Sequence, residues 1–407
     1  MKLSHILLVA ALALTSSMSL HAIDIQSQLV KPGFELKSIT YTSVDVHNQP
    51  VTLSAEIAYP VSKQVTFCVL NGHGTTCNDN EVPTGSTPQD MNIMNCTAAD
   101  GAFVVSPDYL GYGSTANLDH PYCVPLITAR NCVDALLAAK KYAAEELGVT
   151  FPADCKTLNV GASQGGGTAL AVQYYLETYA DADVAAEVNL SKTIAVAAPS
   201  FLSFIFDEYR KDEPLDYPGA VALSVLGTMQ GFSEGCLHAY QDETLYFNSK
   251  FLQTGLLDVL RQRQTSAYDY NALTFKTLGN EVRISDIVTP ELLDIESPLG
   301  RAMARAMTQC NLNRPDWTPK APIVLMHQTG DEVVPYECTH QFCAFLDSKG
   351  ASYGVVSDED MANQLLVEYV GGSNKNYELY IYFNTFTSPH TQTCGHFYIY
   401  FADGLMR

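Results

Sequence analysis

The segment Gly161-Ala162-Ser163-Gln164-Gly165 restricts the possible folds more than any other part of this 407-residue chain. The residues before it, at 157–160, have the pattern of a strand, and the run from Gly166 onward has the pattern of a helix, with no loop between them. Such a change of direction needs a very sharp turn, and glycines on both sides of the serine avoid clashes with the backbone. We therefore expect Ser163 to project above the edge of a sheet, beside the N–H groups that begin a helix.

The order of strand-like and helix-like segments predicts a layered α/β fold. Two alternating runs at 36–47 and 51–60 suit an antiparallel edge of a sheet. Apolar runs then alternate with helical patterns, which implies a mostly parallel central sheet with helices on both faces. The later strands are expected at 64–72, 101–113, 156–163, 192–200, 321–335 with its following loop, and 376–385, and the helices at 128–148, 164–180, 336–350 and 391–406.

The pattern changes between residues 201 and 317. This region is rich in Phe, Tyr, Leu and Met, contains helical stretches and shows no strand signal. We interpret it as a largely helical cap inserted after the sixth strand. The cap then divides one core into a first part at 23–200 and a second part at 318–407.

Residues 1–22 have the features of a secretory signal peptide. Lys2 gives a positive start, the stretch 6–14 is apolar, and small or neutral residues precede a cleavage site after Ala22, with Ser19 as the alternative. No later stretch is long and apolar enough to span a bilayer. We therefore expect a secreted or periplasmic protein without a transmembrane segment. Eleven cysteines suit an oxidising compartment, although Cys68 and Cys155 also fit as buried thiols, and spacing does not give the pairing.

The net charge of −21 limits the classes of partner. An acidic surface disfavours nucleic acids and other anionic polymers, because phosphate groups are bound mainly by Lys and Arg. A neutral small molecule is compatible with this charge, and the oligomeric state cannot be derived from it.

A serine hydroxyl needs a base and an acid before it can act as a nucleophile. On this kind of sheet the chain order is serine, carboxylate, histidine. Asp331 follows a strand and is the expected acid, with Glu332 as the competitor. The histidines after it are His340, His390 and His396. His340 falls within an expected helix, and His396 lies nearly two turns into another. His390 lies in a loop, and this position favours it as the base.

The segment after the third strand, "LNGHGTTCND", is rich in glycine and lets the backbone approach a substrate closely. We expect the N–H groups of Thr75 and Gln164 to form an oxyanion hole. Further along, Asp108, Tyr109 and the run His120-Pro121-Tyr122 either line a pocket or, for Asp108, organise the glycine turn.

These segments together resemble the α/β-hydrolases, and in particular their secreted lipase and esterase branch. The resemblance is carried by "NGHGTTCNDNEVP", "SPDYLGYGST" with "HPY", "NVGASQGGG", "GDEVVP" and "SPH", which cover the core from about 65 to 200 and from about 322 to the end. It implies an α/β-hydrolase fold with Ser163 as nucleophile, Asp331 as acid, His390 as base, and Thr75 and Gln164 as oxyanion donors. The cap has no matching segment, and the second histidine in "HTQTCGHF" departs from the pattern.

The hypothesis that follows is a secreted serine hydrolase that cleaves a small-molecule, lipid or carbohydrate ester through an acyl-enzyme, without a cofactor or metal. One alternative is a peptidase of the prolyl-oligopeptidase type, although the chain before the third strand is too short for the N-terminal propeller of such enzymes. Another is a catalytically inactive binding protein. Cys338, His340 and Cys343 resemble metal ligands but lack the fourth ligand of a structural zinc site.

Overall fold

The computed structural model of the chain describes residues 33–85, 94–95 and 97–356, together with His390 and Cys394. The expected leader at 1–22, the strand at 376–385 and His396 lie outside the described residues. These three expectations therefore stay predictions.

In the described part of the chain, one sheet contains the strands β1 (Phe34–Val44), β2 (Pro50–Pro60), β3 (Phe67–Gly72), β4 (Ala102–Pro107), β5 (Thr157–Ala162), β6 (Leu190–Val196), β7 (Ile323–Met326) and β8 (Tyr353–Val356). Their order across the sheet is β1-β2-β4-β3-β5-β6-β7-β8. The pairs β1–β2 and β2–β4 are antiparallel, and every other neighbouring pair is parallel. The predicted antiparallel edge on a mostly parallel sheet is confirmed.

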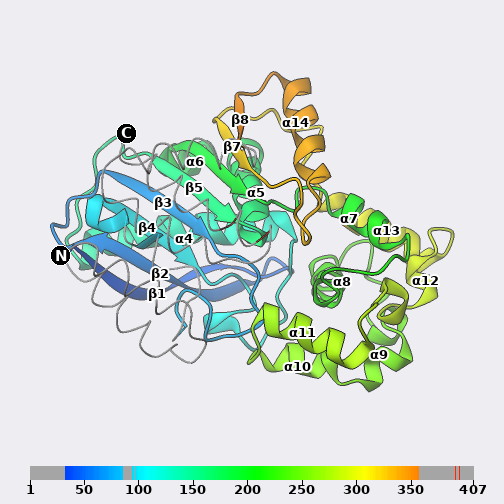
Figure 1. Cartoon of the computed structure of the whole chain (residues 1–407). Helices are drawn as coiled ribbons and strands as arrows, with labels where there is room; N and C mark the ends of the chain where they lie inside the picture. The colour runs from blue at the N-terminus through cyan, green and yellow to red at the C-terminus, as the bar shows by residue number, and fades with distance from the viewer. Residues whose placement is uncertain (1–32, 86–93, 96, 357–389, 391–393, 395–407) are drawn as a thin grey trace, which may run out of the picture.

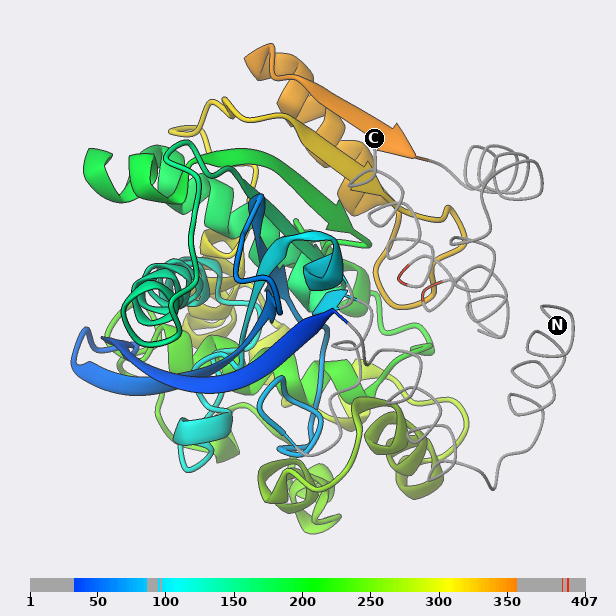
Figure 2. The ribbon, with the colours of Figure 1, turned by 90° about the vertical axis from the view of Figure 1, so that its left-hand side faces the viewer.

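The two faces of the sheet belong to different apolar clusters. On β4, Phe103 and Val105 pack into a large cluster with helices α4 (Pro125–Glu146), α5 (Gln164–Thr178) and α14 (Glu337–Lys349), while Val104 packs into a smaller cluster with Met94. All of β4 is buried. This is the burial expected of a strand that is covered on both faces. Figure 2 shows the sheet running from the blue antiparallel strands β1 and β2 to the orange strand β8 at its other edge.

The chain between β6 and β7 is helical, as predicted for the cap. It contains α7 (Leu202–Tyr209), α8 (Gly219–Gly231), α9 (Ser249–Gln253), α10 (Leu256–Gln262), α11 (Ala267–Leu278), α12 (Pro290–Leu293) and α13 (Pro298–Gln309). These helices lie to one side of the sheet (Figure 1) and enclose a cluster of their own. Tyr122 and Val124, which precede α4, belong to that cluster and join the cap to the core.

The sequence pattern does not predict two short elements. The helix α6 (Ala182–Val188) has seven residues, of which only Val188 is buried, so it lacks a clear apolar stripe. The strand β8 has four residues, one of them Gly354, and its place comes from parallel pairing with β7. Pairing between distant segments leaves little trace in so short a local pattern.

Trp317, the sole tryptophan of the chain, is buried where the chain returns from the cap to the core. Its ring packs against Tyr174 and Phe342, and its indole N–H donates to Glu177 Oε2 at 2.8 Å.

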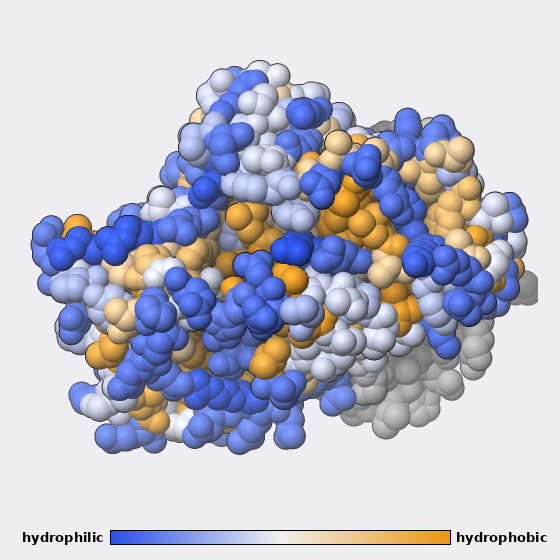
Figure 3. All heavy atoms as spheres, turned by 180° about the vertical axis from the view of Figure 1, so that it is seen from behind, coloured by the Kyte–Doolittle hydropathy of each residue, from blue (hydrophilic) through white to orange (hydrophobic). Residues whose placement is uncertain are grey.

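Among the helices that the structure describes, none has the length and apolar character to cross a membrane. On the face in Figure 3, hydrophilic residues surround separate apolar areas.

Candidate active site

The turn that carries Ser163 joins β5 directly to α5. Ser163 has φ 56° and ψ −123°, a conformation that side chains with a Cβ rarely adopt. Its N–H donates to the carbonyl oxygen of Val196 at 2.8 Å, which ties the turn to the end of β6. The predicted change from strand to helix without a loop is confirmed, and Ser163 is only half-buried.

The glycines around Ser163 are required by close backbone contacts. A Cβ on Gly161 would lie 2.2 Å from the carbonyl oxygen of Gly165, and a Cβ on Gly165 would lie 2.0 Å from that of Gly72. Because Gly72 also pairs with Gly161 across β3 and β5, the turn sits directly against the end of the neighbouring strand. Ser163 and the glycine-rich segment after β3 therefore share one edge of the sheet.

The structure brings Ser163, His390 and Asp331 together although they are far apart in the sequence. Ser163 Oγ lies 3.0 Å from His390 Nε2, and His390 Nδ1 lies 2.7 Å from Asp331 Oδ2. In the neutral ring, Nδ1–H donates to the carboxylate and Nε2 accepts from the serine hydroxyl. This arrangement allows His390 to take the serine proton while Asp331 holds the ring.

Asp331 is held by more than the histidine. Its Oδ1 accepts from the N–H groups of Val333 and Val334 at 2.9 and 2.8 Å. Its Oδ2 also lies 3.3 Å from Nε2 of His327, a buried residue just after β7. The sequence reasoning missed His327, for which the only local signal is its place four residues before Asp331. Both oxygens of the carboxylate thus have partners other than His390.

The other candidates for acid and base lie elsewhere. Glu332 Oε2 accepts from the backbone N–H of His390 at 3.1 Å, so Glu332 holds the backbone and Asp331 the ring. His340 is exposed on α14 and lies 3.1 Å from Glu337. Cys338 on the same helix is buried, so it faces away from His340. Among the described residues, no group of three or more His, Cys, Asp or Glu side chains is arranged so that it could hold a metal ion.

Burial and hydrogen bonding shift the pKa values of Asp331 and His390 in opposite directions. Burial alone would raise the pKa of Asp331, but hydrogen bonds from His327 and His390 outweigh it and hold that pKa well below the ordinary range. Burial alone would lower the pKa of His390, but Cys394 and the hydrogen bond to Asp331 outweigh it and raise that pKa well above 6.5. Asp331 is therefore ionised, which favours the protonated form of His390.

The two residues expected to donate to an oxyanion lie at the same edge. Gln164 is the first residue of α5, and Thr75 follows β3 by three residues. Thr75 Oγ1 lies 2.8 Å from the hydroxyl of Tyr122, and Gln164 Nε2 lies 2.6 Å from His120 Nε2. Hydrogen bonds with Tyr122 and His120 thus hold the side chains of Thr75 and Gln164. The roles of these two residues as oxyanion donors stay predictions.

The residues whose role the sequence left open lie behind this edge. Tyr109 is buried, and its hydroxyl donates to the carbonyl oxygen of His73 at 3.1 Å. The carboxylate of Asp108 is fully buried and accepts from Ser54 and Thr84. Ser54 in turn accepts from the N–H of Ser114, in the glycine turn after β4, at 2.9 Å. Asp108 therefore fits the second expectation, in which it organises that turn.

A hollow adjoins the turn between α4, α5 and the end of α13. It is lined by Cys123, Val124, Pro125, Thr128, Gln164, Gly167, Thr168, Pro199, Cys310 and Leu312. The lining is mainly apolar, and Cys310 and Leu312 come from the segment that leaves the cap.

Among the solved structures that resemble this chain over most of its length are an esterase and a lipase. The rice cell wall degrading esterase LipA from Xanthomonas oryzae superposes with a TM-score of 0.68 at 18% identity, covering 94% of this chain and 94% of that chain. Lipase A from Candida antarctica superposes with a TM-score of 0.58 at 18% identity, covering 82% of this chain and 73% of that chain. The chain has the α/β-hydrolase fold.

The α/β-hydrolase fold was not evident from whole-sequence similarity. No protein-family profile and no curated protein matches the sequence. At this level of identity the structural likeness establishes the α/β-hydrolase fold, which was expected from short motifs. The activity has to be argued from the site itself.

Proposed function

We propose that this protein is a serine hydrolase that cleaves carboxylic esters. The observation that carries the proposal is the chain of contacts from Ser163 Oγ through His390 to Asp331, at 3.0 and 2.7 Å. The similarity of the fold to those of proteins described as an esterase and a lipase supports the same chemistry. No described feature favours amide over ester substrates.

In the proposed reaction, Ser163 Oγ attacks the acyl carbonyl while His390 Nε2 takes the hydroxyl proton. The carbonyl oxygen becomes an oxyanion, stabilised by the N–H groups of Thr75 and Gln164. His390 then gives its proton to the leaving alkoxide, so that an alcohol departs and the acyl group stays on Ser163. Water, deprotonated by His390, attacks the acyl-enzyme. The bond to Ser163 Oγ then breaks, His390 returns the proton to that oxygen, and the acid is released.

We assign the cap, at 201–317, to the binding of the apolar part of the substrate. The small hollow beside Gln164 is lined mainly by apolar atoms, which come from both the core and the end of the cap. An acyl chain or an apolar alcohol suits such a lining better than a charged group.

We also propose that the protein is exported through the leader at 1–22. N-terminal analysis of the protein from its own host would test this.

Intact-mass analysis after treatment with a fluorophosphonate tests the nucleophile. We expect one adduct on Ser163 in the folded protein and none in Ser163→Ala. A panel of esters of increasing acyl length, compared with aminoacyl amides, then tests the bond. Failure of the folded protein to form the adduct would remove the enzymatic proposal, and faster turnover of amides would reassign the protein to the peptidases.

A further inference from the structure

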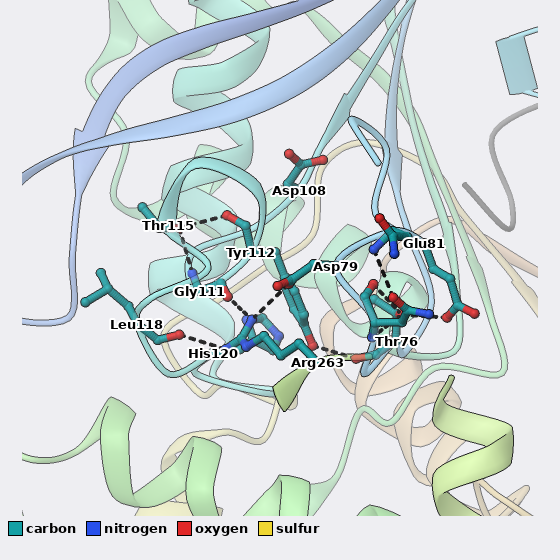
Figure 4. A network of polar contacts seen from close by, with 12 residues as sticks. Thr76, Asp79, Glu81, Asp108, Gly111, Tyr112, Thr115, Leu118, His120 and Arg263 are labelled. Carbon is teal, nitrogen blue, oxygen red and sulfur yellow. Dashed lines mark hydrogen bonds and ion pairs between the residues drawn. The ribbon is translucent and has the colours of Figure 1, made fainter. Parts of the chain in front are cut away.

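Arg263 is a cationic residue of the cap whose side chain is buried against the core. It follows α10 and is 9% exposed. Figure 4 shows its side chain reaching the loop after β4, where its guanidinium donates to the carbonyl oxygens of Gly111 and Leu118. The same group lies 4.6 Å from the ring centre of Tyr112. One planar cation thus binds two points of that loop and an aromatic face.

The backbone of Arg263 binds a second core loop, the one that follows β3. The N–H of Asp79 donates to the carbonyl oxygen of Arg263 at 2.9 Å, and Asn78 forms an isolated antiparallel bridge with Gln264. The Asp79 carboxylate lies 3.8 Å from the guanidinium. A buried guanidinium is costly unless its donors are satisfied, so this arrangement holds the two loops in a fixed relation to the cap.

From Arg263, one line of contacts leads to Thr75. The ring of Tyr112 lies under the guanidinium, and its hydroxyl donates to the carbonyl oxygen of Thr76 at 2.5 Å. Thr76 directly follows Thr75, so this bond fixes the carbonyl group of the residue after the expected oxyanion donor. A shift of Tyr112 would therefore move Thr75.

A second line of contacts leads to Gln164. The loop that Arg263 binds at Gly111 and Leu118 also holds His120, whose ring packs on Tyr112 at 4.8 Å. Burial lowers the pKa of His120 to about 3, so its ring is neutral, and its Nδ1–H donates to the carbonyl oxygen of Leu110 at 2.7 Å. Its Nε2 must then accept, and it accepts from the side-chain amide of Gln164 at 2.6 Å.

We propose that Arg263 is a positioning residue for the oxyanion hole, through which the cap sets the geometry of Thr75 and Gln164. This inference rests on the proposed function and adds a role for the cap beyond substrate binding. Arg263 touches neither donor itself. It acts through Tyr112 on one side and His120 on the other.

Arg263→Met tests the proposal, because it keeps a long apolar side chain and removes the donors. We expect kcat for a short ester to fall by about 10- to 100-fold, as for a small misplacement of catalytic groups, while KM changes little. Affinity for a boronic acid, whose tetrahedral adduct places an oxygen in the hole, should fall by a similar factor. Arg261→Met is the matched control, since that half-exposed guanidinium pairs with Glu243 and should leave both values unchanged.

Arg263→Lys provides a second variant if the methionine variant does not fold. A lysine keeps the charge but cannot match the planar fork, so we expect a smaller loss of kcat, again without a matching rise in KM. Unchanged kcat per titrated site in either folded variant, or an effect confined to KM, would overturn the proposal. Failure of the unmodified protein to react with the fluorophosphonate would instead sink the proposed function, which separates the two claims.

Discussion

The protonation state of the His390 ring should affect both the activity and the stability of the protein. Its pKa is raised well above 6.5 because Cys394 and Asp331 together outweigh the effect of burial. The neutral ring is the proposed base, so kcat/KM should fall as the pH falls through this raised pKa. In a pH profile of kcat/KM measured on a neutral ester, we expect the midpoint of the acid limb to lie above pH 6.5. A value of kcat/KM that stays at its maximum as the pH falls to 6.5 and below would contradict the assignment.

Stability should follow the opposite course around neutral pH. A group with a raised pKa in the folded state stabilises the fold fully below its unfolded value of 6.5, and this contribution is lost as the pH rises through the folded value. Asp331 has a lowered pKa, so its contribution is present above about 3.8 and is lost as the pH falls through its folded value. Thermal melts of the wild type and of His390→Gln across this range should separate the histidine contribution.

Single replacements distinguish the two C-terminal histidines. We expect His390→Ala to lower kcat by roughly 10⁴-fold or more, because the serine loses its base. His396→Ala should keep most of the activity, since His390 already lies between Ser163 and Asp331. Steady-state kinetics with site titration give both values, and the reverse result would transfer the role to His396.

Among the elements, the join between β5 and α5 depends on glycines that differ in their surroundings. A Cβ on Gly165 would lie 2.0 Å from the carbonyl oxygen of Gly72, whereas a Cβ on Gly167 would lie 3.4 Å from the ring of Pro199. We expect Gly165→Ala to cost about 2–4 kcal/mol of unfolding free energy and to lower activity. Gly167→Ala, the control, should be neutral or stabilising by up to about 1 kcal/mol. Denaturant titration would measure both, and equal effects would refute the steric argument.

The strand β3 and the loop before β5 carry two thiols that lie close together. Cys68 Sγ and Cys155 Sγ are 3.6 Å apart, and both residues are buried. We expect refolding with oxidised glutathione to join them, each thiol losing a proton and the pair giving two electrons to the glutathione disulfide. Closing so long a loop should stabilise the protein by up to about 4 kcal/mol.

Peptide mapping without reduction would identify the Cys68–Cys155 bond, with Cys68→Ser as the control. Alkylation of both thiols after oxidative refolding and denaturation would contradict this prediction. Within the described part of the chain, Cys68 and Cys155 are the cysteines whose sulfur atoms lie in contact. Their spacing in the sequence, 87 positions, gives no sign of this pair.

Local sequence signals predict some elements of this molecule and not others. The turn at Ser163 is predictable because its glycines and its flanking strand and helix are contiguous. His327 and β8 are not, because their places depend on contacts with Asp331 and β7 that form only in the fold. The link between Arg263 and the loop after β4 likewise joins residues about 150 positions apart, and a single arginine in a helical region gives no sign of it.

For the whole molecule, the main cluster of the sheet and the cluster of the cap each take in side chains from the other part of the chain. Tyr122 and Val124 of the core chain pack into the cap cluster, and Phe201 and Leu312 at the ends of the cap pack into the main cluster. The order of strands and helices was sufficient to predict a cap after the sixth strand. The way the cap is fastened to the core depends on side chains whose partners the sequence pattern does not reveal.

Trp317 gives this protein a single tryptophan, whose fluorescence can be excited selectively at long ultraviolet wavelengths. It sits in the main cluster where the cap ends, so its emission should be shifted to the blue in the native state and should move to the red when the core opens. Far-UV circular dichroism, by contrast, draws much of its signal from the cap helices. Because the core and the cap each contribute side chains to the cluster of the other, we expect both signals to change at the same denaturant concentration. An earlier change in dichroism alone would reveal a cap that unfolds by itself.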